Sequence, residues 1–232
     1  MISVIIPTYN ESEHIASTIR AIYQKGTRQA ITEVIVVDGG STDDTVQQAR
    51  AVGARVIVST HKGRAVQLNQ AAQVAIGNVL YFLHADTTPP IGFTTDIMEA
   101  VKSGYHSGCF LLSFDFSHWF LKANCWFTRF NPIFFRFGDQ SLFVTKEKFT
   151  QIGGYDEAHT VLEDQEIIKR LRKNNKFIIL KKPVLTSARK YLTNGIYKTQ
   201  GIFFLIYAMY FLGFSQHQLV STYRKLIPGN KI

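Results

Sequence analysis

The stretch Val79-Leu80-Tyr81-Phe82-Leu83-His84-Ala85-Asp86 decides how the rest of the chain is interpreted. It begins as an unbroken apolar run and ends at an acid. Such a run is typical of a strand buried on both faces of a parallel sheet, although a core helix segment shows the same pattern. If it is a strand, Asp86 lies at the carboxyl end, where open α/β sheets bind ligands. There a carboxylate can hold a hard cation and through it a phosphate; the alternative is a cap or turn before Pro89 and Pro90.

The residues before this stretch repeat one pattern. Apolar runs at 2–6, 34–37 and 55–58 alternate with segments of helical periodicity at 12–25, 41–52 and 64–76, and Ser41 with Asp44 resembles a capping box. This alternation predicts an α/β fold with a doubly wound, mostly parallel sheet and helices on both faces. The first run opens into Thr8-Tyr9-Asn10-Glu11, and the second ends in Asp38. We therefore expect these polar ends and Asp86 to lie on one edge of the sheet.

The second half of the chain is less regular. We expect a helix at 93–103, strands at 109–116 and 141–145, a helix that opens at Glu163-Asp164, and two short strands at 177–180 and 184–187. No linker, repeat or long charge block marks a boundary, so 1–232 is expected to be a single domain.

Composition limits the class of partner. The chain has 232 residues with 46% apolar content and a formal charge of +9, and a basic excess indicates an anionic partner. No nucleic-acid module is present and the basic pairs are dispersed, which favours a phosphorylated small molecule or an anionic membrane face. Two cysteines outside any CxxC motif and a strand-like start without a basic leader predict a cytoplasmic protein.

Nucleotide binding is the function that the strand ends favour. The chain lacks GxGxxG after its first strand and lacks GxxxxGK[ST], so a Rossmann dehydrogenase and a P-loop NTPase are disfavoured. Carboxylates and a metal could hold a nucleotide instead. Asp38 could accept an N–H of uracil or guanine, Tyr9 could stack on the base, Lys62 and Arg64 could meet phosphate oxygens, and Asp86 could hold a bridging cation. Each residue alone has an equally good structural explanation, but together they favour a phosphorylated nucleotide.

Three motifs resemble glycosyltransferase family 2. They are SVIIPTYNE at 3–11, VVDGGSTD at 36–43 and HAD at 84–86. The resemblance continues through Gly138-Asp139-Gln140 and Leu162-Glu163-Asp164 and so spans most of the chain. These last pieces, with the short C-terminal tail, resemble a small bacterial subgroup associated with arsenosugar biosynthesis. The family has a GT-A fold and uses nucleotide-diphosphate sugars.

The resemblance implies an enzyme that moves a sugar from such a donor to an acceptor hydroxyl, with inversion and with Mn or Mg. It implies a nucleotide-binding half at 1–90, an acceptor and catalytic half at 91–190, and an apolar helical tail at 191–232. Asp86 is the implied metal ligand, and Glu163 and Asp164 are the catalytic pair, with Asp164 as base. Gly138, Asp139 and Gln140 are implied on the acceptor side. The implied nucleotide-binding residues are Pro7, Thr8, Tyr9, Glu11, Asp38, Gly39, Lys62, Gly63, Arg64, His84 and Ala85.

The sequence departs from the family pattern in two places. The first acid of the metal-binding Asp-x-Asp is His84, which leaves metal strength and identity open, although imidazole can ligate manganese-like ions. The Gln-x-x-Arg-Trp motif is absent, and Arg189-Lys190-Tyr191 stands near its place, so a processive polysaccharide synthase is not expected. One alternative is a sugar-nucleotidyltransferase, which the lack of a Gly-rich basic loop after the first strand disfavours. A non-catalytic nucleotide-sugar-binding protein is another, against which the acids Asp86 and Asp164 argue.

The apolar run at 202–212 is too short to span a bilayer, which needs about 20 residues. It could be a core helix, a dimer surface or an interfacial helix on an anionic membrane, with Lys198, Arg224 and Lys225 beside it. Aromatic residues at 119–137 could line an acceptor site or belong to the core. The expected partners are a nucleotide-sugar donor and a small-molecule or lipid-linked acceptor, without nucleic acid. A homodimer and peripheral contact with the inner membrane face stay open.

Overall fold

The computed structural model describes residues 1–130, 132, 138–174 and 176–227. Within them the strands form one sheet in the order β3-β2-β1-β4-β7-β6-β8-β5. The strands are β1 (Ile2–Thr8), β2 (Ile31–Asp38), β3 (Arg55–Val58), β4 (Val79–Phe82), β5 (Thr87–Thr88), β6 (Ser107–Phe114), β7 (Leu142–Thr145) and β8 (Phe177–Thr186). The α-helices are α1 (Ile15–Lys25), α2 (Thr45–Ala51), α3 (Arg64–Val74), α4 (Phe93–Lys102), α5 (Trp119–Phe127), α6 (Lys146–Gln151), α7 (Glu163–Leu171), α8 (Arg189–Asn194), α9 (Ile196–Phe211) and α10 (Gln216–Leu226).

The sheet is mixed but mostly parallel, as predicted. Strand β1 pairs in parallel with β2 and β4, and β2 pairs in parallel with β3. Strand β7 runs antiparallel between β4 and β6, β8 is parallel to β6, and the short β5, which the sequence did not predict, runs antiparallel on β8. Thr8 lies opposite Asp38 at the carboxyl ends of β1 and β2. The polar strand ends therefore meet at one edge, as expected.

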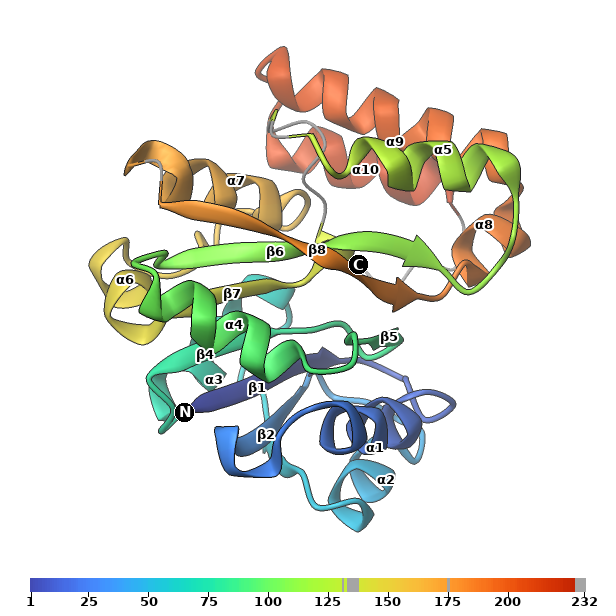
Figure 1. The fold of residues 1–232 in the computed structure, drawn as a ribbon. Coiled ribbons are helices and arrows are strands. Elements are labelled where there is room, and N and C mark those ends of the chain that lie inside the picture. The colour runs from blue at the N-terminus through green and yellow to red at the C-terminus, as the bar shows by residue number, and fades with distance from the viewer. Residues whose placement is uncertain (131, 133–137, 175, 228–232) are drawn as a thin grey trace.

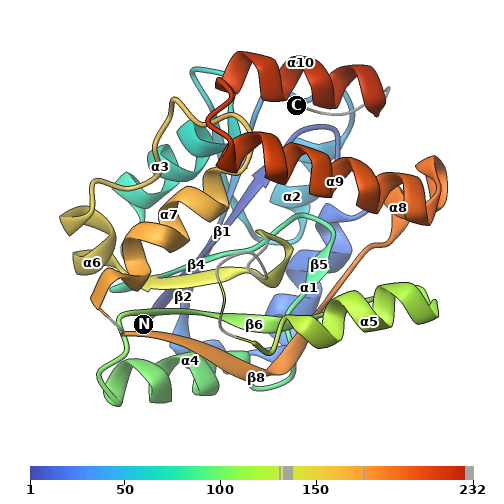
Figure 2. The ribbon, with the colours of Figure 1, turned by 90° about the horizontal axis from the view of Figure 1, so that it is seen from above.

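Helices cover both faces of the sheet (Figures 1 and 2). Side chains of α1, α2 and α4 pack with Val4 and Ile6 of β1 in one core, and those of α3, α6 and α7 pack with Ile5 in the other. Successive strand residues point to opposite faces, so an apolar run without alternation fills both cores. Burial of each such side chain contributes roughly 1.5–3 kcal/mol.

A helical layer made of α5, α8, α9 and α10 lies beyond the sheet, at the top and right of Figure 1. Ile206 of α9 and Leu219 of α10 share one apolar cluster, and Leu121 of α5 and Tyr191 of α8 share another. The expected apolar helical tail, 191–232, contributes most of this layer, apart from 228–232, which lie outside the described residues. None of the described helices has the length and apolarity that crossing a membrane requires.

Two local predictions were wrong. The strands expected at 177–180 and 184–187 are one strand, β8, because its pairing with β6 passes from Leu180 to Pro183 through a register shift. A bulge of this kind lets a strand continue past unpaired residues, here Lys181 and Lys182. The capping box expected from Ser41 and Asp44 is absent because α2 begins at Thr45 without a side-chain cap.

Candidate active site

The carboxylate of Asp38 organises the loop after β2. It is 1% exposed. One oxygen accepts hydrogen bonds from the backbone N–H groups of Gly40 (2.9 Å) and Ser41 (2.8 Å), and the other accepts from the hydroxyls of Thr8 (3.3 Å) and Ser41. Four donors satisfy a carboxylate fully. The Ser41 hydroxyl therefore serves Asp38 rather than the helix that follows.

A residue that sequence reasoning missed, Gln67 on α3, fixes the adjacent strand ends. Its amide donates to the backbone oxygens of Thr8 (3.0 Å) and Val37 (2.8 Å). A Cβ at Gly39 would lie 3.1 Å from this amide nitrogen and 3.4 Å from the Thr8 oxygen, so the close approach favours glycine. The signal in the sequence was a polar residue next to Leu68 on the apolar face of α3.

Arg189 joins two of the predicted site acids. Its guanidinium donates to both carboxylate oxygens of Glu11, at 2.7 and 2.8 Å, and lies 3.1 Å from Oδ2 of Asp86. Glu11 follows β1, Asp86 follows β4 and Arg189 follows β8. The antiparallel pairing of Thr87 with Thr186 brings the last two together. The predicted metal ligand is therefore part of an ion-pair network in this structure.

His84 connects Arg64 with Asp139. Its Nε2 contacts the Arg64 guanidinium, and its Nδ1 lies 3.3 Å from Oδ1 of Asp139. Burial and the nearby Arg64, Lys190 and Arg189 hold the pKa of His84 well below its usual value. A neutral ring that carries its proton on Nδ1 can donate to Asp139 and accept from Arg64 at the same time.

Arg64 also pairs with the predicted catalytic acids. Its Nη1 lies 3.0 Å from Oε1 of Glu163 and 2.9 Å from Oδ2 of Asp164. Arg64 begins α3, and the two acids begin α7, where the helix N-terminus stabilises negative charge. Burial and the neighbouring Asp164 raise the pKa of Glu163 to about 7. A Cβ at Gly138 would overlap Oδ2 of Asp164, so only glycine fits there.

Backbone strain gathers around these motifs. Among the described residues, the non-glycine residues with positive φ are Asn10 (52°), Ser141 (58°) and Leu162 (62°). Asn10 lies between Tyr9 and Glu11, and the other two directly follow Gln140 or precede Glu163. Strained conformations of this kind cluster at functional sites.

The remaining predicted residues have more local surroundings. Pro7 of β1 lies opposite Val37 of β2, and Tyr9 is half-buried just after β1. Lys62 is exposed, and Gly63 precedes α3 with a φ of 131°. Two residues of the predicted set have structural contacts. The Ala85 carbonyl accepts the Thr18 hydroxyl at 2.6 Å, and the buried amide of Gln140 donates to the Phe110 oxygen at 3.1 Å.

Tyr155 is a further residue that the sequence did not indicate. Its side chain is buried, and its hydroxyl has no hydrogen-bond partner within the described part of the chain. Burial and the nearby Asp164 raise the pKa of Tyr155 well above its usual value. The ring packs against Phe82 and Phe149. This phenol directly follows Gly153-Gly154, and no motif of the sequence analysis includes it.

Comparison with known proteins settles the family. The profile "Glycosyl transferase family 2" matches residues 3–150. The chain belongs to glycosyltransferase family 2. The likeness to the arsenosugar-associated subgroup stays a prediction.

Curated relatives of this family 2 chain match part of its length. The glycosyltransferase AglJ of Haloferax volcanii is 31% identical over 105 residues, 45% of this chain and 33% of AglJ. Glucosyl-3-phosphoglycerate synthase of Mycobacterium tuberculosis is 34% identical over 97 residues, 38% of this chain and 30% of that enzyme. The match thus spans about a third of each of these two relatives.

Solved structures share the fold. S. aureus TarS 1–349 in complex with UDP-GlcNAc aligns with a TM-score of 0.67 and 15% identity, covering 97% of this chain and 71% of TarS. The mannosyltransferase PcManGT from Pyrobaculum calidifontis, in complex with GDP-Man and Mn2+, aligns with a TM-score of 0.66 and 20% identity, covering 87% of this chain and 59% of the other. These likenesses establish the α/β fold of the family 2 chain.

The side chains around Asp86 suit a divalent cation in part. Mn²⁺ accepts carboxylate and imidazole ligands. Both ring nitrogens of His84 already contact Arg64 or Asp139, so the ring could bind the ion only after releasing Arg64. Among the described residues, no cluster of three His, Cys, Asp or Glu side chains could hold a metal ion. The fit therefore requires diphosphate oxygens and water for the other positions, as is common for cations that bridge phosphates.

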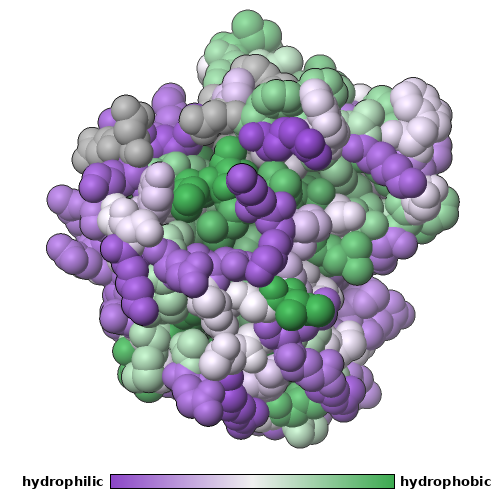
Figure 3. Space-filling model, in the orientation of Figure 1, coloured by the Kyte–Doolittle hydropathy of each residue, from purple (hydrophilic) through white to green (hydrophobic). Residues whose placement is uncertain are grey.

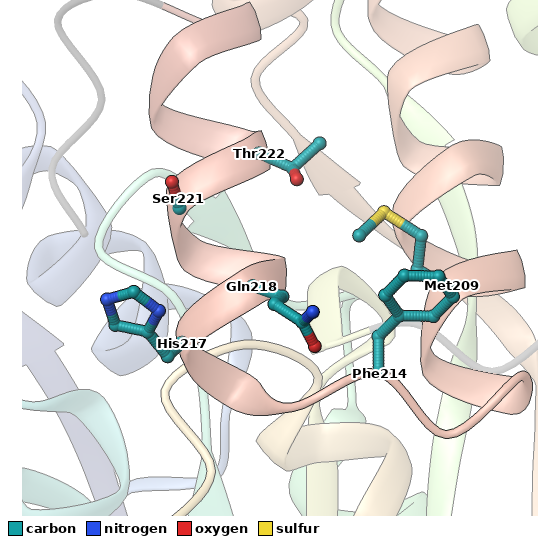
Figure 4. A pocket seen from close by; sticks show the side chains of 6 residues that line it. All are labelled: Met209, Phe214, His217, Gln218, Ser221 and Thr222. Carbon is teal, nitrogen blue, oxygen red and sulfur yellow. The ribbon is translucent and has the colours of Figure 1, made fainter.

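A cavity of about 270 Å³ lies elsewhere, between α9 and α10. Met209, Phe214, His217, Gln218, Ser221 and Thr222 line it (Figure 4). None of the residues predicted for the family 2 site borders this cavity. The acids and arginines at the sheet edge, rather than this cavity, are therefore the candidate active site.

Proposed function

We propose that this chain transfers a sugar from a nucleotide-diphosphate donor to an acceptor hydroxyl, with inversion and with the help of a divalent cation. One observation carries the proposal beyond family membership. Arg64, which follows the donor-side loop, bonds directly to the acid pair Glu163 and Asp164. The Arg64 guanidinium, which is proposed to bind the diphosphate, and the candidate base Asp164 thus lie within one network of contacts.

The donor's nucleotide half is assigned to the ends of β1 and β2. Thr8, Gly39 and the loop held by Asp38 form the floor, and Tyr9 offers a ring face for stacking on the base. Lys62 and Arg64, with Gly63 between them, face the phosphates. Relatives by fold were solved with UDP-GlcNAc or GDP-Man, which supports uridine or guanosine as the nucleoside.

The leaving diphosphate is assigned to the arginines and Asp86. Asp86, with His84 beside it, would hold Mn²⁺ or Mg²⁺, which acts as a Lewis acid on the leaving group when bound. Arg64 adds a fixed positive charge where negative charge develops, and such preorganised charge is a large contributor to catalysis. The backbone around Ala85 places both ligands at the end of β4.

Asp164 is assigned as the base that takes the acceptor's proton. Burial and the neighbouring Asp164 raise the pKa of Glu163, which favours its protonated form and gives Glu163 the supporting role. Gly138 permits the close approach of Asp164, Asp139 orients His84, and Gln140 holds the segment to β6. The acceptor is a small molecule or a lipid-linked molecule. One curated relative is named a dolichyl-phosphate hexose transferase, which supports the lipid-linked alternative.

We further propose that the helical layer docks on an anionic membrane at the inner face. Apolar patches lie over this layer at the top of Figure 3. No Asp or Glu occurs in 116–138 or in 167–232, so the layer is basic as well as apolar, as interfacial helices are. A homodimer is the competing occupant of this surface. Its exposed apolar side chains include Trp119, Trp126, Tyr197, Phe204, Leu205, Phe211 and Leu212.

A panel of nucleotide sugars with Mn²⁺ tests the proposed reaction. We expect slow release of UDP or GDP from at least one donor, faster once an acceptor is found. Release of nucleoside triphosphate when diphosphate and the same nucleotide sugar are supplied would instead indicate a sugar-nucleotidyltransferase. Binding without turnover of any donor, with or without extracts of small-molecule and lipid acceptors, would indicate a non-catalytic nucleotide-sugar-binding protein.

A further inference from the structure

The guanidinium of Arg189 lies where positive charge is needed at the sheet edge. It bridges Glu11 and Asp86, whose side chains are 10% and 17% exposed, and is itself 38% exposed. Asp86 belongs to the donor site proposed above, and Glu11 is one of the nucleotide-binding residues that the family resemblance implies. Glu11 and Arg189 are 178 residues apart in the sequence.

The backbone holds Arg189 firmly in this place. The Thr87 and Thr186 hydroxyls hydrogen-bond at 2.8 Å across β5 and β8, so the chain leaves β8 beside Asp86. The Ala188 N–H then donates to Asp115 at 2.8 Å, and the Arg189 N–H donates to the Ser187 hydroxyl at 3.3 Å. Arg189 therefore begins α8 with a backbone position that these hydrogen bonds set beside Asp86.

Two ligands compete for the charges in this network. A divalent cation that binds Asp86 meets a carboxylate that already has a cationic partner. A diphosphate that enters the site offers Arg189 oxygens with more charge than one carboxylate, and arginine binds phosphate well through its planar fork. Either ligand alone leaves one member of the Arg189–Asp86 pair without its partner, whereas both together give Asp86 the metal ion and Arg189 the diphosphate.

We propose that Arg189 is a built-in counter-cation that neutralises Glu11 and Asp86 in the ligand-free site and moves to the donor's diphosphate when a divalent cation takes Asp86. The proposal rests on the donor site assigned above. It predicts that Mn²⁺ binds weakly without nucleotide, and that part of the coupling between metal and nucleotide passes through Arg189. Coupling of this kind is reciprocal.

Titration of the protein with Mn²⁺ in the absence of nucleotide tests the proposal. The electron paramagnetic resonance signal of free Mn²⁺ measures how much of the ion is bound. Loss of the competing charge in Arg189→Gln should tighten Mn²⁺ binding by about tenfold and weaken UDP or GDP binding in chelator. Arg189→Lys keeps the charge and should bind Mn²⁺ as weakly as the wild type. Arg55→Gln is the matched control, because Arg55 pairs with Glu33 (3.2 Å) at the start of β3, and it should change neither affinity.

Unchanged or weaker Mn²⁺ binding by a folded Arg189→Gln protein would overturn the proposal. So would tighter binding that persists in the double variant Arg189→Gln with Asp86→Asn, because the gained site would then lie elsewhere. The outcome is separable from the proposed function. If Arg189→Gln binds Mn²⁺ more tightly but the wild type turns over no donor, the counter-cation proposal stands and the proposed transferase function is wrong.

Discussion

Single buried charges govern the candidate site, and Asp38 shows how closely fold and function overlap. Its carboxylate is satisfied by four donors from its own loop and from Thr8. A base N–H could therefore reach it only by sharing an oxygen or by displacing a hydroxyl. The structural role follows from this placement at the end of β2, and the proposed nucleotide role would use the same placement.

Asp38→Ala should leave the N–H groups of Gly40 and Ser41 without their acceptor, which costs roughly 1–3 kcal/mol of stability. If Asp38 also contacts the base, this variant should weaken UDP or GDP binding and hardly change the binding of inorganic diphosphate. Calorimetry with the three ligands checks this. Asp38→Asn is the control that keeps the shape of the loop. Equal loss for all ligands would assign Asp38 to the loop alone.

Glu163 makes stability depend on pH. Its folded pKa of about 7 is above the ordinary 4.5, so between these values the folded state binds more protons than the unfolded state. Its contribution to stability is therefore greatest below pH 4.5 and is lost as pH rises through 7. A shift of this size corresponds to an effect on the order of 3 kcal/mol.

Urea unfolding of the wild type and Glu163→Gln at pH 5 and pH 7.5 checks this expectation. The free energy of unfolding of the wild type minus that of the variant should decrease as pH rises, and the constant effects of the substitution cancel in the comparison. An increase would mean that the Arg64 ion pair outweighs burial and that the folded pKa of Glu163 is low.

The elements show which features a sequence can predict. Asp38 was placed correctly at the end of β2, because parallel strands put their carboxyl ends on one edge. Asp86 was expected at the end of a strand, but β4 ends at Phe82 and Asp86 lies in the turn before β5. Arg189 was noted only as a neighbour of a missing motif, since its contact with Asp86 depends on the two-residue strand β5. The bulge at Lys181 and Lys182 was missed because its cause is the register with β6.

The helical layer gives the prediction at this scale. Vesicles that contain anionic lipid should sediment the protein at low salt, and higher salt should release part of it. Phe204→Ser with Phe211→Ser removes two side chains that are 57% and 58% exposed, and should weaken sedimentation by tenfold or more, because each buried ring contributes roughly 1.5–3 kcal/mol. Ile76→Ser, at a residue that is 70% exposed after α3, is the control.

Failure to sediment with any lipid composition would remove the membrane from the proposal. Sedimentation velocity of the same variants then distinguishes the competing occupant, because a dimer formed through this layer should dissociate in the Phe204 and Phe211 double variant. If the protein also stays monomeric in every variant, neither the membrane nor a second copy of the chain covers this layer.

At the scale of the whole molecule, one sheet carries both halves of the candidate site. Strand β4 pairs with β1 of the proposed nucleotide half and with β7 of the proposed catalytic half. Arg64 of the first half pairs with Glu163 and Asp164 of the second. Arg189 of the second half pairs with Glu11 and Asp86 of the first. The sequence predicted the acids, whereas the pairing of each acid with its arginine is a tertiary contact that no local pattern encodes. Gly138 illustrates the same limit, since only the position of Asp164 explains why no side chain fits there.

The most direct test compares the wild type with Asp164→Asn in two assays on the same preparations. Calorimetry with UDP or GDP and Mn²⁺ measures donor-site affinity, and release of nucleotide diphosphate from the best donor measures transfer. Loss of the base should leave affinity within a few-fold of the wild type and lower transfer by a factor on the order of a hundred or more. Transfer at nearly the wild-type rate would contradict Asp164 as the base, and loss of nucleotide affinity would place it in the donor site instead.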